Sequence, residues 1–147
     1  MQRPQLSLKG RALRLLGGRE HSRTELERKL AGHEEEPGQL RRVLDELQAR
    51  GFIDHQRVAD SVVHRRAVKL GAARVRQELQ AKGLEPELVS QAVAGLRDTE
   101  LQRARQVWRR KFDALPADAA ERGKQARFLA ARGFDGDVIR RVLAGEE

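Results

Sequence analysis

The sequence predicts an all-α protein built as an elongated, curved array of three tandem three-helix repeats. A phrase that surrounds Gly83 returns around Gly133, 50 residues later, and a looser copy begins at Leu30. Tyr is absent, Phe and Trp total five, and helix-favouring Leu, Ala, Arg, Glu and Gln dominate, while no useful strand-like alternation appears. Self-similarity at this period is typical of helical units that bury their apolar faces against one another.

The first repeat is predicted over residues 1–53. An apolar stripe that begins at Leu8 ends at Gly17-Gly18 and indicates the first helix. Ser22-Arg23-Thr24-Glu25 has the form of a capping box, which starts a second, short helix. We place Pro37 at the first position of the third helix, where its missing N–H needs no partner, and Gly51 ends that helix.

The second repeat, residues 54–97, divides at Gly71 and Gly83, and its third helix begins at Pro86. The third repeat, residues 98–147, begins at Asp98 or Thr99 as the helix cap, and its second helix ends at Gly133. The segment 116–123 is ambiguous, because Pro116 and Gly123 both interrupt helix. The prediction is therefore nine helices, in units too small to be independent domains.

Positive charge is concentrated in the middle of the chain. Within the net charge of +8, residues 51–112 carry a surplus of +6, the preceding residues +3 and the following residues −1. A basic segment attracts a polyanion, either nucleic acid or an acidic protein assembly. The alternative is a solvated Arg-rich helical surface with no such partner.

The residues that enzymes and metal sites need are not assembled in this sequence. Cys is absent, and none of the four histidines has the neighbours expected of a nucleophilic triad or a zinc helix. There is no phosphate-binding loop. Apart from the run His33-Glu34-Glu35-Glu36, whose consecutive side chains do not converge on one ion, most acidic residues are spread among basic ones. We therefore predict no enzyme, no cofactor and no metal. With no signal peptide and no long apolar run, the expected protein is soluble, cytoplasmic and without membrane contact.

Arg66 breaks the amphipathic pattern of its predicted helix. On a helical wheel at about 100° per residue it falls inside the arc occupied by Val58, Ala59, Val62 and Val63. We expect its guanidinium to be largely buried and hydrogen-bonded to a carboxylate or to helix-end carbonyls, because an unpaired buried charge is costly.

Five segments in order resemble the RecX regulatory proteins of bacteria. The resemblance extends from about residue 9 to 144 and rests on Arg19-Glu20-His21-Ser22-Arg23-Thr24-Glu25-Leu26, the Leu47 to Asp54 segment with Arg57-Val58-Ala59, the Arg66 to Gly71 stretch, Glu78-Leu79 with Lys82-Gly83, and Lys124 to Phe134. The chain departs from the family pattern at His55 and Val58, where many relatives have a second acid and an aromatic residue. It also has Gly32-His33 where the later repeats have Lys82-Gly83 and Arg132-Gly133.

The resemblance implies a monomer that binds the RecA recombinase, chiefly its filament on single-stranded DNA. It implies inhibition of filament growth, ATP hydrolysis and strand exchange, with effects on recombinational repair and the SOS response. It also implies weak contact with single-stranded or double-stranded DNA without sequence preference.

We predict that the partner-binding surface lies on the middle repeat, because six cations of its most basic segment fall off the apolar stripes: Arg57, Arg65, Lys69, Arg74, Arg76 and Lys82. Two other functions remain open. One is a DNA-binding regulator of the helix-turn-helix type, and the other is a helical adaptor for a different partner. Tight binding to a RecA filament, with weak and salt-sensitive binding to naked DNA, would separate the first prediction from both alternatives.

Overall fold

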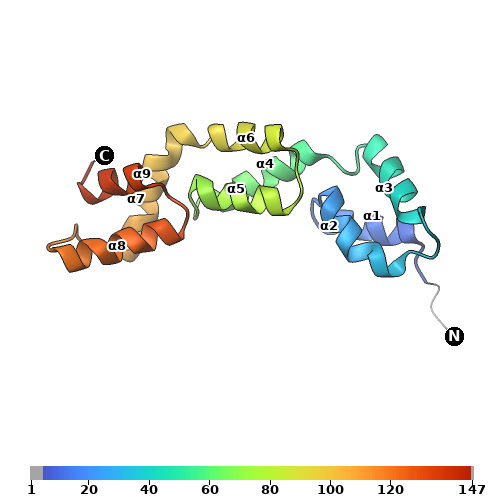
Figure 1. Cartoon of the computed structure of the whole chain (residues 1–147), viewed down its shortest axis with the longest axis horizontal. Helices are drawn as coiled ribbons and strands as arrows, with labels where there is room; N and C mark the ends of the chain where they lie inside the picture. Colours follow the sequence, from blue (N-terminus) through green and yellow to red (C-terminus); the bar gives the residue numbers. More distant parts are fainter. Residues whose placement is uncertain (1–4, 147) are drawn as a thin grey trace.

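The protein is an elongated row of three helical groups, as the computed structural model of the chain shows for the described residues 5–146 (Figure 1). Helices account for all the regular structure in this range. None of them has the length and apolar character needed to cross a bilayer. In chain order they are α1 (Leu8–Gly18), α2 (Arg23–Leu30), α3 (Gln39–Ala49), α4 (His55–Arg66), α5 (Ala72–Ala81), α6 (Pro86–Ala94), α7 (Glu100–Lys111), α8 (Ala119–Ala131) and α9 (Gly136–Leu143), with 3₁₀ turns at Ala31–His33 and Arg97–Thr99.

Each group of three helices encloses its own cluster of buried apolar side chains. Leu26 and Leu44 are fully buried in the first group, Val75 and Leu79 in the second, and Leu129 in the third. Because the three clusters do not merge, no common core joins the groups. The repeats must therefore be held together by the contacts at their boundaries.

Several predicted helix starts are confirmed. The capping box is complete: the Glu25 amide donates to Ser22 Oγ at 3.2 Å, and the Ser22 amide donates to Glu25 Oε1 at 3.1 Å. Asp54 caps α4, and Pro86 occupies the first turn of α6. Thr99 is the N-cap residue of α7, but its side chain accepts a hydrogen bond from Arg103 Nε at 3.1 Å and none from a main-chain amide of the first turn.

The prediction for Pro37 is wrong. Pro37 lies in a turn, and α3 begins two residues later at Gln39, behind Gly38 with φ of +85°. A left-handed residue directly after the proline ends any helix that Pro37 could have opened, and glycine adopts that conformation readily. The ambiguous segment 116–123 resolves similarly: α8 begins at Ala119, capped by Asp118, and includes Gly123.

The prediction that Arg66 is largely buried is also wrong. Its side chain is 44% exposed, although it does pair with a carboxylate, since its Nε lies 3.0 Å from Glu78 Oε1. The helical wheel puts Arg66 on the apolar side of α4, but α4 ends at this residue. A long side chain in the last turn can extend past the buried layer and keep its charged head in water.

The second helices of the three groups meet end to end. The last turn of α8 contacts the first turn of α5: the Gly71 amide donates to Arg132 O at 2.7 Å, and the Ala73 amide donates to Gly133 O at 3.2 Å. The last turn of α5 meets the start of α2 in the same way, with Gly83 against Thr24. Figure 1 shows α8, α5 and α2 following one another along the long axis of the molecule.

At each of these two boundaries, an arginine of the preceding repeat donates a hydrogen bond to the C-terminal end of the second helix of the following repeat. Arg74 Nη1 donates to Ala131 O at 2.7 Å, and Arg28 Nη1 donates to Ala81 O at 3.4 Å. Ala81 and Ala131 occupy the same place in the repeated phrase. A guanidinium at the carbonyl end of a helix satisfies an unpaired acceptor and opposes the negative end of the helix dipole.

Three glycines in the left-handed conformation differ in how closely a neighbouring repeat approaches them, so replacing each with alanine measures how much this close approach affects the free energy of unfolding. Gly51, Gly83 and Gly133 have φ of 80°, 72° and 91°. An added Cβ would meet nothing within 4 Å at Gly51, the movable Thr24 Oγ1 at 2.1 Å at Gly83, and the main-chain nitrogen of Arg74 at 2.6 Å at Gly133.

We expect Gly51→Ala to destabilise the protein by about 1–2 kcal/mol through its backbone conformation alone. Gly133→Ala should cost about 1–3 kcal/mol more, because the main chain of the neighbouring repeat must move, and Gly83→Ala should fall between them. Urea unfolding of the three variants checks the order. Equal losses at all three positions would mean that the close approach contributes nothing.

Candidate functional site

The six cations of the predicted partner-binding surface, which we call the basic strip, are divided by the structure into two sets. Three of them make contacts that hold neighbouring repeats together: Arg57, Arg74 and Lys82. The other three make no side-chain hydrogen bond or ion pair within residues 5–146; Arg65 and Lys69 are exposed, and Arg76 is half-buried. The wheel at about 100° per residue also puts Arg74 and Arg76 on opposite flanks of α5. A single continuous strip is therefore not formed.

Lys82 is built into the boundary between the first and second repeats. Its side chain is only 15% exposed, and its Nζ donates to Glu25 Oε1 at 3.1 Å. Arg19 Nη2 binds the other carboxylate oxygen at 2.6 Å. Burial acts to raise the pKa of Glu25, but the hydrogen bonds from Arg19, from the Ser22 amide and from Lys82 outweigh it and lower the pKa to about 2.

His55 explains one departure from the family pattern. Its Nε2 lies 3.2 Å from the Arg23 amide, which donates to it, so the ring proton is on Nδ1, 2.8 Å from Glu85 Oε1. The same junction includes Arg57, whose Nε donates to Glu20 at 2.8 Å. His55 thus connects α2 of the first repeat to the loop before α6 of the second.

At the second boundary lies a buried pair that the sequence analysis missed. Arg103, with a side chain 12% exposed, donates from Nη1 to Ala67 O and to Leu70 O, both at 2.9 Å. Glu100 Oε1 accepts from the Ala72 amide at the start of α5 at 3.0 Å. The only sign of this pair in the sequence was that Glu100 and Arg103 are three residues apart at the start of a predicted helix. Such acid–base pairs are common on exposed helices, so the spacing does not indicate burial.

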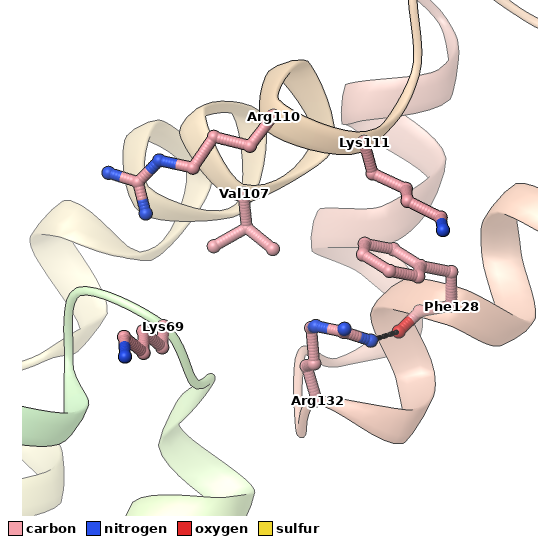
Figure 2. Close-up of a pocket in the computed structure, with 6 residues that line it drawn as sticks. All are labelled: Lys69, Val107, Arg110, Lys111, Phe128 and Arg132. Atoms are coloured by element: carbon pink, nitrogen blue, oxygen red, sulfur yellow. Dashed lines mark hydrogen bonds between the residues drawn. The ribbon is translucent and has the colours of Figure 1, made fainter.

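A basic groove lies between the second and third repeats. Its volume is about 330 Å³, and it is lined by Lys69 before α5, by Val107, Arg110 and Lys111 of α7, and by Phe128 and Arg132 at the end of α8. Figure 2 shows the two α7 cations on one side of the opening, with Lys69 and Arg132 across from them. Lys69 is the only residue of the predicted strip in this lining.

The Phe128 ring holds one of the groove's cations, Arg132, in a fixed orientation. The Arg132 guanidinium carbon lies 3.7 Å from the centroid of the Phe128 ring, and Lys111 Nζ lies 5.9 Å from it. Phe112 packs edge-on against the same ring at 5.2 Å. Such stacking holds the guanidinium plane in place. Within residues 5–146, no cluster of three His, Asp or Glu side chains could hold a metal ion.

Comparison with known proteins gives matches along the whole array. Models of the first, second and third three-helix domains of RecX match residues 9–47, 54–93 and 98–143. The regulatory protein RecX of Leptothrix cholodnii is 57% identical over 141 residues, which cover 96% of this chain and 90% of that protein. The regulatory protein RecX of Ralstonia nicotianae is 46% identical over 147 residues, covering 100% and 92%.

Solved structures agree with the fold. A crystal structure of RecX from Lactobacillus salivarius has a TM-score of 0.77 at 18% identity and covers 94% of this chain and 93% of its own. A second crystal structure of a regulatory protein RecX has a TM-score of 0.76 at 20% identity, with 92% and 70% covered. The predicted all-α array of three three-helix repeats is thereby confirmed. The exact limits at 53/54 and 97/98 stay a prediction.

The lowered pKa of Glu25 predicts how stability depends on pH. The folded pKa of about 2 lies below the ordinary value of 4.5, so the ionised carboxylate stabilises the fold above pH 4.5, and this contribution is lost as pH falls toward 2. Glu25→Gln keeps the capping-box geometry and removes the charge. The variant should therefore melt lower than the wild type at neutral pH, and the two melting temperatures should converge in acid.

Glu87→Gln is the matched control, because Glu87 is an exposed carboxylate in the first turn of α6 that makes no ion pair within residues 5–146. Its melting temperature should follow the wild type across the same pH range. A Glu25→Gln variant that also follows the wild type would show that this ion pair does not stabilise the junction.

Proposed function

The chain belongs to the RecX family of regulatory proteins, and from this premise we propose that it binds the RecA recombinase and its filament on single-stranded DNA and inhibits filament growth, ATP hydrolysis and strand exchange. In this role it modulates recombinational repair and the SOS response. The observation that supports the proposal most is that all three repeats match the family in order, over residues 9–143.

The shape supports binding to a repetitive partner. Three repeats in a row, joined by main-chain contacts at the α8–α5 boundary and by side-chain contacts at the α5–α2 boundary, present a long surface rather than one deep pocket. On a filament, such a molecule can touch more than one subunit. Several weak contacts made by one rigid body add to a high effective affinity without any single strong site.

We propose a monomer that acts in the cytoplasm by binding and without catalysis. Contact with naked DNA is proposed to be weak and independent of sequence, driven by positive charge. The helix-turn-helix alternative is less well supported, because α6, the second helix of the pair α5 and α6, carries Glu87 and Gln91 and no Arg or Lys within Pro86–Ala94. A helical adaptor for another partner remains the alternative that the experiments below exclude or support.

We expect the protein to inhibit RecA-dependent ATP hydrolysis on single-stranded DNA at less than one copy per RecA subunit, since one elongated molecule blocks growth beyond the subunits it touches. A dose series of the protein against a fixed RecA concentration measures this. Unchanged hydrolysis with the protein in large excess would refute the proposed function.

The three cations that make no side-chain hydrogen bond or ion pair within residues 5–146, Arg65, Lys69 and Arg76, are proposed to face the filament. Reversing all three to Glu should weaken filament binding and leave the helical content and melting temperature nearly unchanged. Arg65 and Lys69 are exposed, Arg76 is half-buried without an ion pair in the described residues, and surface substitutions usually shift stability by no more than about 0.5 kcal/mol each. Higher salt should reproduce part of the loss. The comparison variant reverses Arg140 and Arg141, whose charges are paired with Asp137 and Glu146. A larger loss in that variant would place the interface on the third repeat.

A further inference from the structure

The groove between the second and third repeats holds positive charge that the protein does not neutralise. Its lining includes two lysines, two arginines and no carboxylate. In the described residues, Arg110 and Arg132 are bonded only to the carbonyl oxygens of Val68 and Phe128, each at 3.3 Å. At the first boundary, by contrast, Lys82 meets the carboxylate of Glu25. Four cations gathered without an acid among the lining residues indicate that the matching negative charge comes from a ligand.

The hydrogen-bonding character of the groove narrows the choice of ligand. Lys and Arg side chains donate and cannot accept, while Val107 and Phe128 side chains do neither. The two carbonyl oxygens nearest the cations are already used by Arg110 and Arg132. An acidic peptide would bring backbone N–H donors that find no acceptor here. A phosphodiester backbone offers acceptors alone, so it matches a lining that consists of donors.

We propose that this groove is a binding site for the phosphodiester backbone of single-stranded nucleic acid. A volume of about 330 Å³ is near the lower end of the range of small-molecule sites, roughly 300–1,000 Å³. A positively charged groove that follows the backbone is the usual arrangement for single strands.

Phe128 has a positioning role in this site. The Arg132 guanidinium carbon lies 3.7 Å from the centroid of this ring, and Phe112 makes a T-shaped contact with the same ring. The ring is therefore not open for stacking with a base where these two side chains contact it. It holds the guanidinium plane so that the outward N–H groups can bind two phosphate oxygens together. The site therefore binds the backbone without regard to base sequence, because every nucleotide carries the same phosphate oxygens.

This inference deepens the proposed function and rests on it for biological meaning, because a filament regulator that holds the single strand beside RecA competes for the filament's own substrate. It differs from the proposed filament-facing surface in its residues: of the three filament-facing cations, only Lys69 lines the groove. Binding to naked single strands can therefore be tested separately from inhibition of RecA.

The test uses the full chain and fluorescein-labelled oligothymidine of about 20 nucleotides, long enough for a typical single-strand site, with fluorescence anisotropy as the readout. The groove variant is Arg110→Glu/Lys111→Glu. The charge-matched control is Arg41→Glu/Arg97→Glu, which reverses two exposed arginines outside the groove whose side chains make no hydrogen bond or ion pair within residues 5–146. Circular dichroism confirms that both variants are folded.

We expect the groove variant to bind at least about tenfold more weakly and the control to lose much less. For the wild type, four phosphate contacts predict a slope of log affinity against log salt near about −3, and losing two contacts should reduce that slope by about 1.4. Arg132→Lys keeps the charge but loses the planar, stacked group. It should weaken binding severalfold with the salt slope nearly unchanged.

Four results would overturn the proposal: equal losses in the groove variant and the control, no binding of oligothymidine by the wild type, duplex DNA competing as well as the single strand, or polyglutamate displacing the oligonucleotide equally well. Inhibition of RecA ATP hydrolysis is measured in parallel on the same variants. A wild type that binds oligothymidine through the groove but does not inhibit RecA refutes the proposed function and leaves the groove site intact. The opposite pattern refutes the groove and leaves the function.

Discussion

The contact between the last turn of one second helix and the first turn of the preceding one is the constraint on which the array depends. Each repeat has a separate apolar core, so the direction in which one repeat follows the next is set at these boundaries. At the second boundary, the Gly133 carbonyl accepts from the Ala73 amide, and no side chain could stand between the two main chains. Helix dipoles that meet head to tail favour the same arrangement.

This constraint also explains why the three copies of the repeated phrase differ. Gly83 and Gly133 each press against a preceding repeat and adopt a left-handed conformation. Gly32, in the first copy, belongs to a 3₁₀ turn and has nothing within 4 Å of an added Cβ. The Lys/Arg-Gly pair thus stands in the two copies of the phrase whose glycine contacts a preceding repeat.

The fold could be predicted because its signals are local or periodic. Ser22 and Asp54 start helices through bonds to amides a few residues away, and Leu79 and Leu129 recur at the repeat period. The two wrong predictions concern residues at helix ends, where the exact position at which a helix stops or starts decides the result. Arg66 is exposed because α4 stops there, and Pro37 opens no helix because Gly38 turns the chain first.

The candidate site was less predictable, because charge along a sequence does not show which charges will be paired. Arg57 and Lys82 look like free basic residues in the sequence and find Glu20 and Glu25 only across the fold. The groove was hidden for the same reason. Its residues come from three separate segments around 69, 110 and 130, which become neighbours only when α8 docks on α5. Of the predicted residues it contains Lys69 alone.

The most direct test of the central claim, that fixed repeat boundaries let one molecule span a RecA filament, is electron cryo-microscopy of the protein on filaments assembled on single-stranded DNA. We predict density for the whole three-repeat row, with the α8–α5 and α5–α2 boundaries unchanged and with contacts to more than one RecA subunit. Density in which the repeats separate from one another, or in which the molecule touches a single subunit only, would contradict the account.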